Sequence, residues 1–187
     1  MRRRAKRVRP STLVALAVVP ALISALAGCQ SGGVAANGPL SSGDGPHDPV
    51  SRGAVCTPDG GPQTDGLTVF TNYGSTTVIL DRVVLLRARN QRLLGAYAVP
   101  SGNFIVGNPH GWPPRDSPLP SGWKHRQPVH GFRLAAGRSF NMVLGVAPIA
   151  KGLSISHGML VYYHDSSGSY VAKDYWAEGI QDKRHAC

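Results

Sequence analysis

Short stretches of alternating apolar and polar residues, rich in β-branched side chains, recur between residues 67 and 180 and constrain the fold most strongly. Turn-forming residues separate these stretches, and none shows the three-to-four-residue spacing of an amphipathic helix. The pattern predicts strands at residues 67–73, 77–88, 92–99, 129–134, 139–146, 158–164 and 169–180. Seven strands of this length and spacing favour an all-β fold, specifically an immunoglobulin-like antiparallel β-sandwich.

Local signals within this pattern predict turns and one irregularity. Residues 72–75, 136–137 and 166–168 are rich in Gly, Asn and Ser, which favour tight turns. Asp81-Arg82 interrupts the second strand and indicates a β-bulge. The stretch from Thr71 to Leu80 is similar to the strand-turn-strand opening of small immunoglobulin-like domains on bacterial envelope proteins. That resemblance implies a fold and no activity.

The amino terminus differs in character from the rest of the chain. Six Arg and Lys residues precede residue 10, an apolar run covers residues 13–26, and the sequence Leu26-Ala27-Gly28-Cys29 follows. The run is shorter than the roughly 20 residues that a membrane-crossing helix needs. This layout resembles the precursor of a bacterial lipoprotein, with Leu-Ala-Gly-Cys as its lipobox. The alternatives are a secretory peptide cleaved without lipid attachment and a short anchor helix.

The lipoprotein resemblance implies cleavage after Gly28 and a diacylglycerol on the thiol of Cys29. Two or three acyl chains hold a protein on a membrane without a spanning helix. Residues 30–54 contain almost no large apolar side chain, which predicts a flexible linker. We therefore expect a signal peptide at 1–28, lipidated Cys29 with a disordered tether at 29–55, and a β-sandwich at 56–187 on the extracytoplasmic face of the cell membrane.

The charge of the chain narrows the choice of partner. There are 20 Lys and Arg residues against 10 Asp and Glu, but six of the cations lie in the leader. The remaining cations are scattered from Arg52 to Arg184, whereas nucleic-acid binding needs a dense basic stripe. We expect no nucleic-acid partner. The expected partners are the membrane, through the lipid, and an envelope protein or polymer.

Cys56 and Cys187 remain once Cys29 carries lipid. They stand before the first predicted strand and at the last residue, and exported proteins meet oxidising surroundings. The positions predict a disulfide bond that closes a loop of about 130 residues, worth about 4 to 5 kcal/mol in the chain-entropy interpretation. The alternative is a free thiol pair for redox or metal chemistry, which lacks the Cys-x-x-Cys spacing.

Residues 101–128 form a long insertion rich in Pro and Gly. Its Trp112 and Trp123, near Arg115 and Lys124, are candidates for binding a sugar ring or a partner peptide. The other interpretation, which we favour, is that both indoles fold back over the sandwich and seal it.

A copper(I) carrier is the alternative function. His157 and Met159 lie two residues apart on one predicted strand, and Met142 on a neighbouring strand offers a second soft ligand. The set loosely resembles that of periplasmic copper chaperones with a cupredoxin-like fold, which carry a His two residues before the ligand Met. In this chain Phe140, not a His, stands two residues before Met142. Both Met residues are equally suited to a hydrophobic core.

No constellation of residues predicts catalysis. There is no Gly-x-Ser-x-Gly motif, and the consecutive residues 164–166 suit a hairpin turn. Asp174 and Glu178 share one strand face at a separation of about 13 Å, beyond that of glycosidase carboxylates. We expect no enzymatic activity, no catalytic residue and no resident cofactor, but a binding or scaffolding domain.

Overall fold

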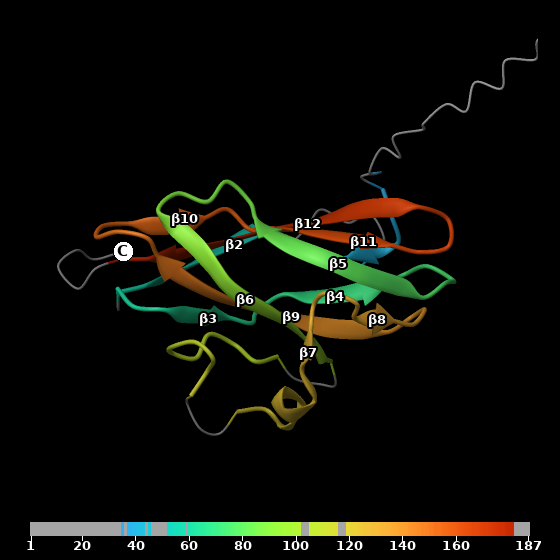
Figure 1. Ribbon diagram of the computed structural model, residues 1–187, viewed down its shortest axis with the longest axis horizontal. Coiled ribbons are helices and arrows are strands. Elements are labelled where there is room, and N and C mark those ends of the chain that lie inside the picture. The colour runs from blue at the N-terminus through green and yellow to red at the C-terminus, as the bar shows by residue number, and fades with distance from the viewer. Residues whose placement is uncertain are drawn as a thin grey trace, which may run out of the picture. The chain divides into compact units, whose positions relative to one another are not determined.

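The computed structural model describes residues 35, 37–43, 45, 52–58, 60–101, 105–115 and 119–181, which form strands β1 to β12 and one short 3₁₀ helix, η1 (Figure 1). The signal peptide at 1–28, Cys29 and Cys187 lie outside these residues. In chain order the elements are β1 (Leu40–Ser41), β2 (Arg52–Thr57), β3 (Gln63–Asp65), β4 (Val69–Asn72), β5 (Val78–Leu85), β6 (Gln91–Pro100), η1 (Ser121–His125), β7 (Gln127–Pro128), β8 (Arg133–Leu134), β9 (Ser139–Pro148), β10 (Ser154–Ser156), β11 (Met159–His164) and β12 (Ser169–Ile180).

Two sheets face each other across a shared core (Figure 1). The β9 sheet has the order β1-β4-β9-β6-β7, and β3 also pairs with β9. The β12 sheet has the order β10-β12-β11-β5-β8, and β2 also pairs with β12. All strand pairs are antiparallel except β2 with β12. The prediction of an all-β sandwich of mainly antiparallel strands is confirmed.

Six of the seven predicted strands correspond to β4, β5, β6, β9, β11 and β12, and the predicted bulge is present. The strand predicted at 129–134 is wrong for its first residues, because 129–131 form a turn and only β8 (Arg133–Leu134) is extended. Tyr162 pairs with Arg82, but Tyr163 pairs with Leu80, so that Asp81 is the extra residue in β5. The 166–168 hairpin joins β11 to β12. At the 136–137 turn Gly137 has φ 65°, a left-handed conformation that glycine adopts without strain.

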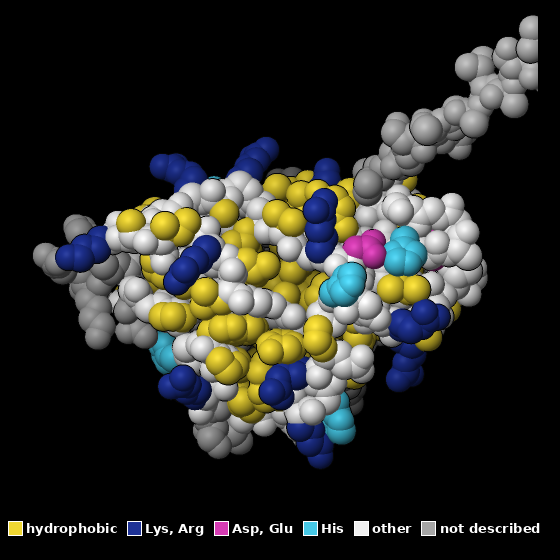
Figure 2. Space-filling view, in the orientation of Figure 1, with side chains coloured by type: hydrophobic (Ala, Val, Ile, Leu, Met, Phe, Trp, Pro, Cys, Tyr) yellow, Lys and Arg dark blue, Asp and Glu magenta, His cyan; other side chains and the backbone are white. Residues whose placement is uncertain are grey.

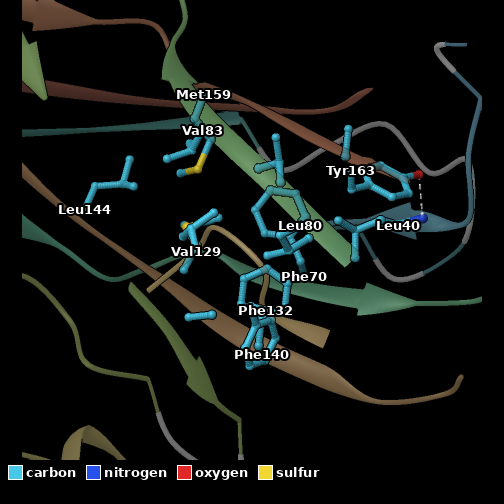
Figure 3. Close-up of a cluster of buried hydrophobic side chains, with 14 of the residues drawn as sticks. Leu40, Phe70, Leu80, Val83, Val129, Phe132, Phe140, Leu144, Met159 and Tyr163 are labelled. Carbon is cyan, nitrogen blue, oxygen red and sulfur yellow. Dashed lines mark hydrogen bonds between the residues drawn. The ribbon is translucent and has the colours of Figure 1, made fainter. Parts of the chain in front are cut away.

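Alternating side chains from both sheets fill the core (Figure 3). In β11 the residues Met159, Val161 and Tyr163 point inward, and their neighbours are more exposed. The rings of Phe70 and Phe140 stack with centroids 5.7 Å apart. This interior explains why a period of two in the sequence predicts the fold, because each strand has one face buried against the other sheet. No helix in the described part of the chain is long and apolar enough to cross a membrane.

The predicted tether is too long, because part of it belongs to the sandwich. The strand β1 pairs with β4, and the amide of Leu40 donates to the Oη atom of Tyr163 at 3.0 Å (Figure 3). The amide of Ala35 donates to the backbone oxygen of Ser169 at 3.0 Å, and β2 runs beside β12. Composition misses these contacts because backbone pairing requires no large side chain. A Cβ at Gly38 would clash with the ring of Tyr170 at 2.6 Å, so the close approach depends on glycine.

Candidate functional site

The insertion packs against the outer face of the β9 sheet. Phe140, Met142, Leu144 and Val146 of β9 point into the core between the sheets, and Val143 points the other way. There it forms a second apolar cluster with Val99, Val106 and Trp123, and with the partly buried Tyr97, Trp112 and Leu119. Because the insertion covers this face, β9 is buried on both sides from Phe140 to Ala147.

Two paired glycines make room for the indole of Trp112. Gly95 of β6 lies opposite Gly145 of β9. A Cβ at Gly95 would come within 3.0 Å of Trp112 Cζ2, and one at Gly145 would clash with the same indole. The ring of Tyr97 stacks on Trp112 with centroids 5.6 Å apart and meets Trp123 edge-on at 5.7 Å. The indole thus occupies space that any other residue at Gly145 would fill.

Of the two interpretations of the indoles, packing against the sandwich describes the structure. Trp123 is only 8% exposed, and Trp112 is partly buried. Arg115 and Lys124 are exposed. The guanidinium of Arg126 covers the Trp123 ring at 4.6 Å. Trp112 and Trp123 therefore pack on the sandwich, whereas partner binding by the exposed Arg115 and Lys124 stays a prediction.

The insertion also covers the edge of β3. The amide of Thr64 donates to the oxygen of Pro109 at 3.3 Å, and the amide of Gly107 donates to the oxygen of Gly66 at 3.1 Å. The hydroxyl of Thr64 donates to the oxygen of Gly111 at 2.6 Å. These bonds satisfy backbone groups that an open strand edge would leave free to pair with another chain.

Three carboxyl groups are buried where β3 faces β12. Asp174 and Glu178 occupy inward-facing positions of β12, and Asp65 comes from β3; each is at most 3% exposed. The two sheets therefore place like charges in the interior, where ionisation is costly. Sequence reasoning identified Asp174 and Glu178 on one strand face but missed Asp65, because β3 is too short to show a pattern. Asp174 and Glu178 lie an even number of residues from the buried Ala172 and Ile180. This spacing was a signal that both carboxyl groups point inward.

Asp174 has the best hydrogen bonding of the three. It accepts hydrogen bonds from the hydroxyls of Thr68 (3.1 Å) and Ser42 (3.2 Å) and from the amide of Trp176 (3.2 Å). Burial nevertheless raises the pKa of Asp174, and these hydrogen bonds only oppose the increase. Ser42 lies in the N-terminal segment, so this carboxyl group also fixes that segment to the β12 sheet.

The pKa values of Glu178 and Asp65 are raised, which favours the neutral form of each carboxyl group. Burial, reinforced by the charge of Asp65, raises the pKa of Glu178 from 4.5 to about 8. Burial also raises the pKa of Asp65 from 3.8 to about 6. The hydrogen bond from the amide of Leu67 opposes this increase, and the charge of Asp174 adds to it. At neutral pH Glu178 is therefore largely protonated and can act as a hydrogen-bond donor.

Glu178 and several other buried side chains have polar atoms without a protein partner. Asn108 Nδ2 of the insertion donates to Glu178 Oε2 at 3.5 Å, and Gln91 Nε2 donates to the backbone oxygen of Glu178 at 3.3 Å. Buried side-chain atoms with no hydrogen bond in the described residues are Gln63 Nε2, Gln91 Oε1, Ser154 Oγ, Trp176 Nε1 and Glu178 Oε1. Each such atom costs about 1 to 3 kcal/mol unless water reaches it.

The structure does not bring the three candidate copper ligands together. Met142 lies on the β9 sheet and Met159 on the β12 sheet, and both are buried in the apolar core, whereas the side chain of His157 is exposed to solvent. Within the described ranges, no group of three or more His, Cys, Asp or Glu residues is placed to hold a metal ion.

The residues at the 166–168 hairpin serve the turn. The carboxylate of Asp165 accepts the amides of Ser167 at 2.7 Å and Gly168 at 3.2 Å. Burial tends to raise the pKa of Asp165, but these hydrogen bonds and one from the hydroxyl of Thr76 outweigh that effect and lower it. His164 Nδ1 lies 2.8 Å from Asp81 Oδ1 in the bulge of β5. His164 and Asp165 therefore face different partners.

No family model and no curated protein matches the sequence. Among solved structures, the chain is similar to the PapD-like domain 7 of human CEP192, at 11% identity over 95% of this chain and 100% of that one, with a TM-score of 0.36. It is also similar to the VesB protease of Vibrio cholerae, at 11% identity over 70% of this chain and 30% of VesB (TM-score 0.36). The secreted serine protease VesC of the same organism matches at 13% identity over 67% of this chain and 21% of VesC (TM-score 0.30). At these TM-scores the matches assign no activity.

Proposed function

We propose that this protein is a lipoprotein anchored to the extracytoplasmic face of the cell membrane, and that its β-sandwich binds or scaffolds an envelope partner without catalysing a reaction. The observation that carries the proposal is Leu26-Ala27-Gly28-Cys29 at the end of an apolar run with a basic tip. Acylation of Cys29 would attach the mature chain directly to the membrane.

A non-catalytic role is supported by the positions of the residues with reactive side chains, which serve the fold. The histidine and aspartate of residues 164–166 hold a turn and a bulge, and the indoles of the insertion cover the β9 sheet. The carboxyl groups of Asp65, Asp174 and Glu178 are enclosed between the sheets. Among the described residues, His164, Asp165, Asp174 and Glu178, which sequence reasoning weighed for catalysis, thus have structural roles.

The predicted disulfide bond is part of the same proposal. Cys56 lies on β2, and its Sγ atom would be 3.4 Å from a Cβ at Gly179 of β12. After β12 the amide of Gln181 donates to the oxygen of Thr57, so the chain leaves this strand beside β2. A bridge from Cys56 to Cys187 would tie the C-terminal end to β2.

Mass spectrometry of the full-length protein from bacterial membranes tests the proposal. We expect an N-terminal peptide that begins at Cys29 and carries a diacylglyceryl mass, and an unreduced peptide pair that links Cys56 to Cys187. The variant Cys29→Ser should lose the lipid mass, whereas the control Cys56→Ser should keep it. An intact leader, or a processed terminus without fatty acid, would refute the anchor.

A further inference from the structure

The chain leaves little free length between the proposed anchor and the folded domain. Ala35 is the sixth residue after Cys29, and its backbone is already held on β12. Its amide donates to Ser169 and its oxygen accepts the amide of Val171, at 3.0 and 2.9 Å. Six fully extended residues span at most about 20 Å. A lipid on Cys29 would therefore keep the start of β12, beside the 166–168 hairpin, close to the membrane.

The opposite end of the sandwich lies far from this attachment. β12 extends from Ser169 to Ile180, a length of about 36 Å at 3.3 Å per residue. Ile180 pairs with Ser154, directly after the loop that joins β9 to β10. Arg89 pairs with Ile155 and brings the β5–β6 turn to the same end. We call residues 86–92 and 148–153 the distal tip; in Figure 1 it lies at the β10 end, away from the β11–β12 hairpin.

The distal tip combines exposed aliphatic and cationic side chains. Ile149 is 66% exposed and Leu153 is 52% exposed. The cations of the same two segments are all exposed: Arg87, Arg89, Arg92 and Lys151. Neither segment of the tip contains an acidic residue. Among the acidic residues in the described ranges, Asp65, Asp174 and Glu178 are buried, and the face drawn in Figure 2 shows many Lys and Arg side chains.

Asn90 holds the two segments of the tip together. Its Nδ2 atom donates to the oxygens of Ala150 (3.0 Å) and Leu153 (3.3 Å), and its Oδ1 atom accepts the amide of Ala150 (2.8 Å). The amide of Ile149 donates to the oxygen of Asn90 at 3.0 Å. Asn90 has φ 52°, a left-handed conformation that asparagine tolerates better than most residues. The loop is thus fixed before any partner arrives, which lowers the entropy lost on binding.

We propose that the distal tip is a docking surface for a protein partner that has an acidic rim around an apolar recess. Ile149 and Leu153 enter the recess, and Arg87, Arg89, Arg92 and Lys151 face the rim. An anionic polymer would pair with the cations and leave both aliphatic side chains in water, whereas an apolar centre with a charged rim is the anatomy of a protein interface. The presentation of the tip away from the membrane rests on the proposed lipid anchor; the docking chemistry does not.

Peptide probes test the docking chemistry on the full-length protein in phosphatidylcholine nanodiscs. The first probe is a fluorescent peptide of alternating Glu and Leu, and the second is a polyglutamate of equal charge. We expect the first to bind at least about tenfold more tightly. Leu153→Ser and Lys151→Glu should each weaken it about fivefold or more. Lys173→Glu makes the same charge change on an exposed part of β12 and should leave the affinity unchanged.

Four outcomes would overturn this proposal. Equal affinity for polyglutamate would indicate an anionic polymer, and preferential binding to phosphatidylglycerol vesicles would indicate a lipid surface. Failure of both peptides to bind, or binding that survives both tip variants, would remove the docking site. None of these results bears on acylation of Cys29, which the mass of the protein reports separately.

Energy transfer to dye-labelled lipid headgroups tests the orientation. A donor dye at Ser167 should transfer more efficiently than one at Ala150, because the hairpin lies at the attached end. Equal transfer, or more transfer from Ala150, in a protein whose lipid mass is confirmed would refute the orientation and leave the anchor intact.

Discussion

Glu178 shows how one buried side chain makes the stability of the domain depend on pH. Its pKa is about 8 in the folded protein and 4.5 as the ordinary value, so the folded state binds more protons than the unfolded chain between these limits. Stability then falls as pH rises, by up to about 1.4 kcal/mol per pH unit for one group. Asp65 adds the same trend between 3.8 and about 6. Denaturant unfolding should therefore give a lower free energy of unfolding at about pH 9 than at about pH 5.

Glu178→Gln is the variant that checks this origin. The amide cannot ionise, so the decrease in stability above pH 6 should largely disappear. Asp165→Asn is the matched control, because its pKa is lowered and it titrates below this range. A wild-type slope that persists in Glu178→Gln would assign the pH dependence to other groups.

The insertion, at the scale of an element, depends on the glycine beneath Trp112. Gly145→Ala places a methyl group where the indole lies, so the insertion must shift. We expect a loss of about 1 to 3 kcal/mol in the free energy of unfolding and a red shift of tryptophan fluorescence. Gly61→Ala is the control, since a Cβ there meets nothing within 4 Å. Unchanged stability and fluorescence in Gly145→Ala would show that the insertion is loosely held.

The elements that could be predicted from the sequence are those with enough alternating residues to show a period of two. The missed strands β1, β3, β7 and β10 have two or three residues each, and the first four residues of β2 were assigned to the linker by their composition. Pairing with a neighbour, rather than local pattern, determines these strands. The same limit hid Asp65, and with it the link between the two carboxyl groups of β12. Sequence reasoning left two roles open for Trp112 and Trp123. The burial of Trp123 and the position of Trp112 over the Gly95–Gly145 pair decide between them.

At the scale of the whole molecule, residues 37–43 connect the two sheets, although their composition predicts a tether. Leu40 is 4% exposed and belongs to the main core; its amide bonds to Tyr163 of the β12 sheet, and its strand pairs with β4 of the β9 sheet. Leu40→Ala should therefore cost about 2 to 5 kcal/mol in denaturant unfolding. Leu153→Ala removes the same atoms from an exposed site and should cost within about 0.5 kcal/mol.

Leu40→Ala also tests whether stability and anchoring share one cause. Weaker packing of residues 37–43 would release Ala35 from β12 more often, which lengthens the free chain after Cys29. The difference in energy transfer between dyes at Ser167 and Ala150 should then shrink, because the root-mean-square reach of a flexible chain grows with the square root of its length. A variant that is as stable as the wild type, with an unchanged difference in transfer, would mean that this segment does not close the sandwich.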